Sequence, residues 1–82
     1  MFHRAYVKYT ISVITKADPK WKDVAQTYTR FSAERSFKKY SAMINPNEAR
    51  ISLSKVVIPR GRFIISTEEL KSKGTDIDNI IK

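Results

Sequence analysis

Cysteine is absent from this sequence of 82 residues, and only two glycines and one histidine occur. Without cysteine the chain can form no disulfide, no thiolate nucleophile and no sulfur-ligated zinc site. His3 stands alone near the N-terminus, with no second histidine or paired carboxylates at ligand spacing, so we expect no metal site. The two glycines are too few for a glycine-rich loop that cradles phosphates. We therefore expect a protein without cofactors that is not an enzyme.

Long apolar runs are also missing, since no such run exceeds four residues. This pattern predicts neither a signal-peptide core nor a membrane span, so we expect a cytoplasmic protein. Hydrophobic residues still make up 41% of the chain, which is enough to build a core and argues against a disordered basic peptide. The length predicts a single domain over residues 1–82.

Acidic residues are scarce, with eight against sixteen lysines and arginines, which gives a net charge of +8. Residues 1–66 hold thirteen basic and four acidic groups, whereas residues 67–82 hold three and four. A basic body of this kind attracts polyanions, so the charge indicates a nucleic-acid or nucleoprotein partner. Surplus lysine that serves solubility alone is the competing interpretation.

The first half of the sequence predicts two strands and a helix. Residues 5–16 alternate between apolar and polar side chains and read as a half-buried strand. Residues 27–31 suit a second strand, which we expect to end at Phe31. Ser32 is a good N-cap for a helix that begins at Ala33, and the Asn-Pro-Asn breaker within 44–49 stops that helix.

An alternative places a helix over residues 19–29, because Trp21, Val24, Ala25 and Tyr28 have helical spacing. The order of elements then becomes βααββα in place of ββαββα. That version resembles, in element order only, the small basic ribonuclease toxins of bacterial toxin–antitoxin systems. This resemblance would imply a metal-free ribonuclease.

The second half predicts two more strands and a helical end. Residues 49–58 alternate with a phase slip at Lys55, where we expect a bulge or a twist. Residues 63–67 form the returning strand after a turn at 59–62. A capping box at 66–69 would open a short helix that ends at Gly74, and Thr75 would cap another. Residues 67–82 are thus expected to be a short helical C-terminal segment. The predicted fold class is α+β, a four-stranded antiparallel sheet with the helices on one face.

Exposed tyrosines among cations on the uncovered sheet face form the first candidate site. Such a surface stacks bases on its rings and holds phosphates with its cations, which favours single-stranded nucleic acid. The predicted platform consists of Tyr6, Lys8, Tyr28, Arg30 and Arg50. Cross-strand packing without any ligand is the competing interpretation, because tyrosine is simply a good strand former.

Two more basic groups extend this hypothesis. Arg60 and Arg62 flank a turn and could clamp phosphates, while Arg35, Lys38 and Lys39 share the outer side of the predicted helix. Each group is also consistent with a solvated turn or helix face. The paired acids Glu68–Glu69 and Asp76/Asp78 are expected to serve helix starts rather than catalysis.

The sequence therefore predicts a small non-enzymatic nucleic-acid-binding protein, largely without sequence preference. The alternative is an accessory or inhibitor protein, of the kind that viruses and mobile elements encode, which binds a nucleic-acid-handling partner. A homodimer through a sheet edge is also expected to be possible.

Overall fold

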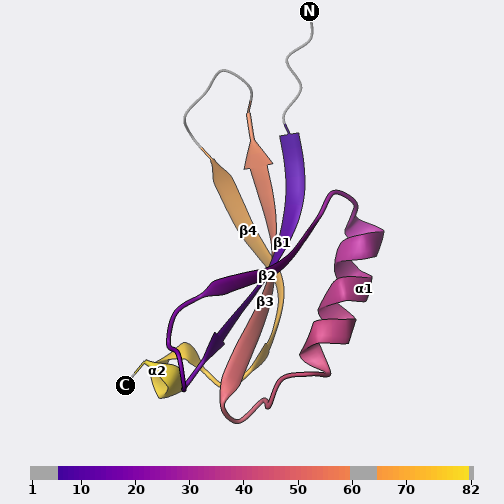
Figure 1. The fold of residues 1–82 in the computed structure, drawn as a ribbon. Coiled ribbons are helices and arrows are strands. Elements are labelled where there is room, and N and C mark those ends of the chain that lie inside the picture. The colour runs from indigo at the N-terminus through magenta and orange to yellow at the C-terminus, as the bar shows by residue number, and fades with distance from the viewer. Residues whose placement is uncertain (1–5, 60–64, 82) are drawn as a thin grey trace, which may run out of the picture.

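A computed structural model describes residues 6–59 and 65–81, and these form four strands and two helices (Figure 1). The elements are β1 (Tyr6–Thr15), β2 (Lys22–Thr27), α1 (Arg30–Ser41), β3 (Ala49–Ile58), β4 (Ser66–Gly74) and α2 (Ile77–Ile80). All paired strands are antiparallel, in the order β2-β1-β3-β4. The predicted α+β class and the ββαββα order are confirmed. The alternative helix over 19–29 is wrong, and so is the element order behind the resemblance to ribonuclease toxins.

The two central strands set the faces of the sheet. β1 and β3 pair without interruption from Tyr6 opposite Ile58 to Thr15 opposite Ala49. Side chains alternate between the faces, because successive residues of a strand point to opposite sides. One side, which we call the helix face, carries the buried Ile11, Ile51 and Leu53. The other side, which we call the open face, carries the even-numbered residues of β1 and β3.

Helix α1 packs on the helix face, where the buried core forms. Ile11, Ala33, Ile51 and Leu53 are the buried cluster, and Phe37 and other half-buried residues pack against it. Figure 1 shows α1 lying along one side of the strands. The small side chain of Ala33 lets the helix approach the sheet closely, so the core lies between α1 and the two central strands.

The start of α1 corrects the predicted boundary. Thr29 is the N-cap, and its Oγ1 accepts a hydrogen bond from the Ser32 backbone N–H at 3.2 Å. Ser32 therefore lies inside the helix rather than before it, and β2 ends at Thr27 rather than at Phe31. Threonine caps nearly as well as serine, so Thr29 can start the helix three residues before the expected cap.

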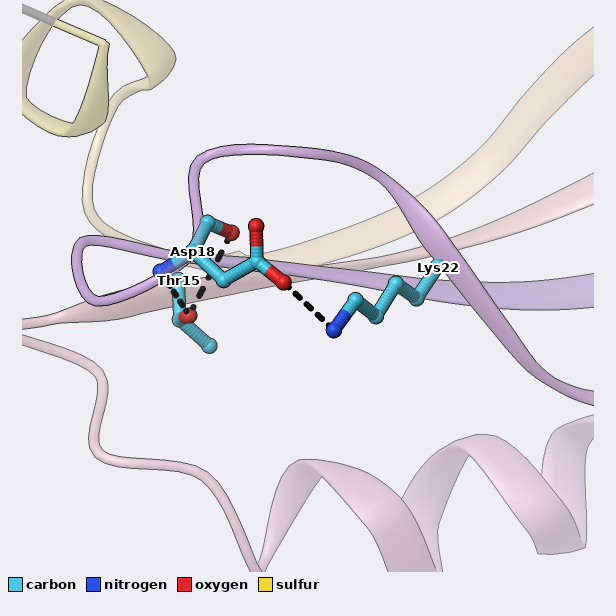
Figure 2. Close-up of polar contacts among 3 residues, drawn as sticks. All are labelled: Thr15, Asp18 and Lys22. Atoms are coloured by element: carbon cyan, nitrogen blue, oxygen red, sulfur yellow. Dashed lines mark hydrogen bonds and ion pairs between the residues drawn. The ribbon is translucent and has the colours of Figure 1, made fainter.

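The connection from β1 to β2 is a polar turn that side chains close (Figure 2). The backbone N–H of Asp18 donates to Thr15 Oγ1 at 3.1 Å, and the Asp18 carboxylate pairs with Lys22. Pro19 follows at once, where its fixed φ suits a turn. These contacts lead the chain back into β2 rather than into the alternative helix.

Strand β4 occupies residues for which a helix was predicted, so the prediction of a helical segment from 67 to 74 is wrong. Its residues pair with β3 from Val57 opposite Ser66 to Arg50 opposite Gly74. Pairing along the whole strand outweighs one capping box, which stabilises a helix by only about 1 kcal/mol. The expected slip within β3 is absent from its pairing with β1. The register shifts against β4 instead, beside Leu53 and Ser54.

Gly74 ends β4 in a conformation that favours glycine, with φ at +116°. A Cβ at this position would lie 2.1 Å from the Ala49 carbonyl oxygen. The absence of a side chain therefore allows β4 to run against β3 to its last residue.

Helix α2 is a single turn near the end of the open face. Its N-cap position is Asp76, one residue later than expected, and Thr75 Oγ1 accepts from the Asn79 side chain at 3.2 Å. Ile77 borders a hollow together with Ser12 and Ser52, which belong to the open face. The two helices thus lie on different sides of the sheet, whereas one shared face was expected.

Within residues 6–59 and 65–81, neither helix has the length and apolar content to cross a membrane.

Candidate nucleic-acid interface

Two exposed tyrosines lie together at one end of the open face. The ring centroids of Tyr6 and Tyr28 are 5.7 Å apart, with an angle of 60° between the ring planes. Tyr6 comes from the start of β1, and Tyr28 follows the end of β2. Their exposed fractions are 45% and 61%. The two rings therefore form a tilted aromatic pair that retains free surface for a ligand.

Lys8 lies beside this pair, two residues after Tyr6 on the same face of β1. The half-buried side chains of Val56 and Ile58 come from the neighbouring strand, opposite Lys8 and Tyr6. We call Tyr6, Lys8 and Tyr28 the tyrosine platform. It combines aromatic rings, one cation and an apolar border on the sheet face opposite α1.

The contact between the two tyrosines also changes the pKa of Tyr6. A hydrogen bond with Tyr28 raises the pKa of the Tyr6 phenol above its ordinary value of 10.0. The neutral phenol of Tyr6 is the form that this contact favours, so this residue adds no negative charge that would repel a phosphate.

Two residues of the predicted platform lie elsewhere. Arg30 is the first residue of α1 and not part of a strand. Arg50 is opposite Ile14, eight residues along β1 from Tyr6, which is about 26 Å. The five predicted residues therefore do not form one row.

The Arg50 guanidinium is also engaged within the fold. Its Nη1 donates to the carbonyl oxygens of Gly74 and Thr75, both at 3.2 Å, and its Nη2 donates to Ser72 Oγ at 2.8 Å. These bonds connect β3 to the end of β4. Arg50 thus has a structural role that a free phosphate ligand would have to displace, and we exclude it from the interface.

The cations of α1 form a separate exposed row of Arg35, Lys38 and Lys39 on the helix. The Arg35 guanidinium carbon lies 5.7 Å from the centroid of the Phe31 ring, and Lys39 Nζ lies equally far from that of Tyr40. We call these three cations the α1 row. Because α1 covers the helix face, the row and the tyrosine platform lie on different sides of the sheet.

Arg60 and Arg62, the predicted clamp, lie outside the described residues, as does His3. Their proposed contacts with phosphates stay predictions.

One ion pair ties α1 to β4 across the helix face. Glu34 Oε1 and Lys71 Nζ are 3.0 Å apart, and both side chains are partly exposed. The hydrogen bond and the charge of Lys71 hold the pKa of the Glu34 carboxyl below its ordinary value, with a further contribution from Arg30. This pair uses the single acid of α1 and connects the helix to β4.

Sequence reasoning missed two aromatic residues that lie on the surface. Phe31 was expected to end a strand, but it lies in the first turn of α1 and is 72% exposed. It borders a groove of about 450 Å³ together with Phe37, Lys38, Lys71 and three other residues of α1. Trp21 is 43% exposed and borders a hollow on the open face. The N-cap residue Thr29 is the feature of the sequence that would have placed Phe31 in the helix.

The paired acids do not serve helix starts as expected. Glu68 and Glu69 belong to β4, where the Glu69 carboxylate accepts a hydrogen bond from Ser52 Oγ at 2.8 Å. Asp76 occupies the N-cap position of α2 but makes no hydrogen bond with its side chain, and Asp78 is in the first turn. Asp76 and Asp78 therefore lie at a helix start as predicted, whereas Glu68 and Glu69 do not.

Comparisons with protein-family models, with curated proteins and with solved structures found no match to this chain.

Proposed function

We propose that this protein is a small, basic, non-enzymatic nucleic-acid-binding protein of the cytoplasm that prefers single strands and reads little sequence. The observation that carries the proposal is the pair of Tyr6 and Tyr28, exposed and 5.7 Å apart on the sheet face opposite α1. Every base has a π-face, so stacking on aromatic side chains gives affinity without sequence preference.

The position of Lys8 defines how a strand would lie. Bases would stack on the two rings while Lys8, on the same face, contacts a phosphate between them. Further along the open face, the carboxylates of Asp23 and Glu69 accept hydrogen bonds from Ser12 and Ser52. Those carboxylates repel phosphates, so the strand would be confined to the end of the sheet that carries the tyrosine platform.

Additional phosphates would meet the cations of α1. A strand that leaves the platform and passes around the molecule would encounter Arg30 and the α1 row, which belong to the chain that directly follows Tyr28. Together with Lys8 these residues give five cations. Neutralising about four or five phosphates predicts a log–log salt slope of about −3 to −3.5 for a single strand.

The proposal is tested by fluorescence anisotropy with single- and double-stranded oligonucleotides of one sequence at several salt concentrations. We expect the single strand to bind more tightly, with the slope given above. The double variant Lys38→Gln/Lys39→Gln should reduce the slope by about 1.4, because each lost phosphate contact contributes about 0.7. Lys73→Gln, a change of charge at an exposed lysine of β4, is the matched control and should leave the slope unchanged. Affinity no greater than that of a generic polycation for both oligonucleotides would refute the proposal.

A second candidate function rests on the exposed Phe31. The groove that it borders carries the cations Arg35, Lys38 and Lys71 against the single acid Glu34. An acidic segment of a partner protein, with an apolar side chain for the groove, would match this surface. The protein would then act as an accessory or inhibitor of a nucleic-acid-handling partner.

Affinity capture with and without nuclease separates the two candidates. Capture of one acidic protein that resists nuclease and fails with Phe31→Ala supports the second candidate. Capture that nuclease abolishes supports the first.

A homodimer through the edge strands β2 or β4 remains part of this second proposal, and sedimentation of the free protein at several concentrations tests it.

A further inference from the structure

A hollow on the open face lies between the central strands, β4 and α2. Its volume is about 430 Å³, and it is bordered by Ser12, Trp21, Ser52, Ser54, Thr67, Glu69 and Ile77. Ser12 is six residues along β1 from Tyr6, about 20 Å from the tyrosine platform. We call it the tryptophan hollow. Its lining differs from that of the platform, because it contains hydroxyls and a carboxylate but no lysine or arginine.

The hydroxyl groups of Ser12 and Ser52, at the floor of the hollow, already donate hydrogen bonds within the protein. Ser12 Oγ donates to Asp23 Oδ1 at 2.7 Å, and Ser52 Oγ donates to Glu69 Oε2 at 2.8 Å. A serine hydroxyl has one proton, so each Oγ then offers only lone pairs to a ligand. The ionised carboxylates also only accept. The floor therefore suits a ligand that is rich in hydrogen-bond donors.

Glu69 and Trp21, which also line the hollow, favour a positively charged ligand. Trp21, which is 43% exposed, and Ile77 of α2 both line the hollow. Among the described residues, Glu69 has no ion-pair partner within 4 Å. A cation held between a carboxylate and an indole gains from both the charge and the ring quadrupole, and tryptophan is the ring that binds cations best.

Arg50 borders an adjoining hollow together with Glu69. Its guanidinium nevertheless donates to the carbonyl oxygens of Gly74 and Thr75 and to Ser72 Oγ. Arg50 is thus held toward the end of β4 rather than paired with Glu69. The negative charge of Glu69 remains available to a ligand.

We propose that the tryptophan hollow binds a compact organic cation, a guanidinium or primary ammonium group carried by a small molecule. The N–H groups of the ligand donate to Glu69 and to the lone pairs of Ser12 and Ser52, while its charged end lies against the Trp21 ring. This site does not depend on the proposed nucleic-acid function, because it uses none of the residues of the tyrosine platform.

Trp21 is the only tryptophan of the chain, so its fluorescence reports on this hollow directly. We would titrate the full chain with agmatine and with ethylguanidinium at constant ionic strength. Ethylurea, which has nearly the same shape but no charge and a carbonyl oxygen in place of one NH2 group, is the control ligand. The expected result is a saturable change in fluorescence with both cations and none with ethylurea at the same concentrations. An equal response to ethylurea, or a change that stays linear with cation concentration, would overturn the proposal.

Two variants complete the test. Glu69→Gln removes the charge and keeps the shape, and it should weaken agmatine binding about tenfold. Glu68→Gln is the matched control, because Glu68 is the neighbouring residue of β4 but lies opposite Lys55 on the helix face. It should leave affinity within about twofold. Thermal melts of both variants verify the fold. Equal effects of the two variants would refute the site, whatever the outcome of the oligonucleotide titrations.

Discussion

Replacing Tyr28 with alanine removes one of the two rings of the tyrosine platform and no charge. Stacking of a base on an aromatic side chain contributes about 1–3 kcal/mol by alanine substitution. Tyr28 already packs against Tyr6 in the free protein, so we expect the lower part of this range, about 1–2 kcal/mol. This corresponds to a Kd for a short single strand that is about 5- to 30-fold higher. The salt slope should stay unchanged, because tyrosine neutralises no phosphate.

The assay is fluorescence anisotropy with a labelled single strand and with its duplex at one salt concentration. Duplex binding should change much less than single-strand binding, since paired bases are not available for stacking on the platform. Tyr6→Ala and the double variant complete a mutant cycle. The two losses should not add fully, because the rings contact each other.

Tyr28→Phe separates the ring from the hydroxyl. Affinity should stay near that of the native chain, whereas the raised pKa of Tyr6 should fall toward its ordinary value when the hydrogen bond is lost. Absorbance of tyrosinate during an alkaline titration measures this shift. A pKa that is raised on folding favours the folded state below pH 10.0, and this contribution is lost as the pH rises through the folded pKa. If Tyr28→Ala and Tyr28→Phe weaken binding equally, or if neither does, the stacking hypothesis is wrong.

Three further predictions concern the framework that holds the sites. Arg50→Ala should destabilise the fold by about 1–3 kcal/mol, because three hydrogen bonds to the end of β4 are lost. Oligonucleotide affinity at temperatures below the melting temperature should stay unchanged. A large loss of affinity would show that Arg50 belongs to the interface. Gly74→Ala should lower the melting temperature further, since its Cβ would lie 2.1 Å from the backbone oxygen of Ala49; a melt equal to that of the native chain would contradict the geometry. The ion pair of Glu34 with Lys71 should stabilise the fold above the ordinary carboxyl pKa of 4.5 and cease to do so as the pH falls through the lowered folded pKa. Lys71→Ala should therefore make the acid limb of the stability profile shallower in a denaturant titration, and an unchanged limb would show that the pair contributes nothing.

The regular strands could be predicted from the sequence because their signal is local. Residues 5–16 and 49–58 alternate strongly, and the observed strands Tyr6–Thr15 and Ala49–Ile58 agree with those ranges. Alternation alone also placed Tyr6 and Lys8 on the face away from the core. Tyr28 lies on the same face, although the strand before it ends at Thr27 rather than at Phe31. Period-2 alternation depends on the backbone only, so it survives errors in the neighbouring elements.

The remaining features depend on contacts that are distant in sequence. Residues 66–69 have the composition of a helix start, but pairing with β3 supplies more backbone hydrogen bonds than a short helix would. The partners of Arg50 come from that same mispredicted strand, so its engagement could not be foreseen. Phe31 lies in the helix rather than at the end of a strand because the cap lies at Thr29, three residues before the expected Ser32. The tryptophan hollow was missed for a similar reason, since it combines residues from four separate elements and a turn.

The central claim is that a single strand of nucleic acid contacts the tyrosine platform, and chemical-shift mapping with a short labelled oligonucleotide tests it most directly. We predict the largest changes at Tyr6, Lys8 and Tyr28, smaller ones along the α1 row, and none in the buried core around Leu53. No response at the two tyrosines while other surfaces respond, or no response anywhere at low salt, would contradict the account.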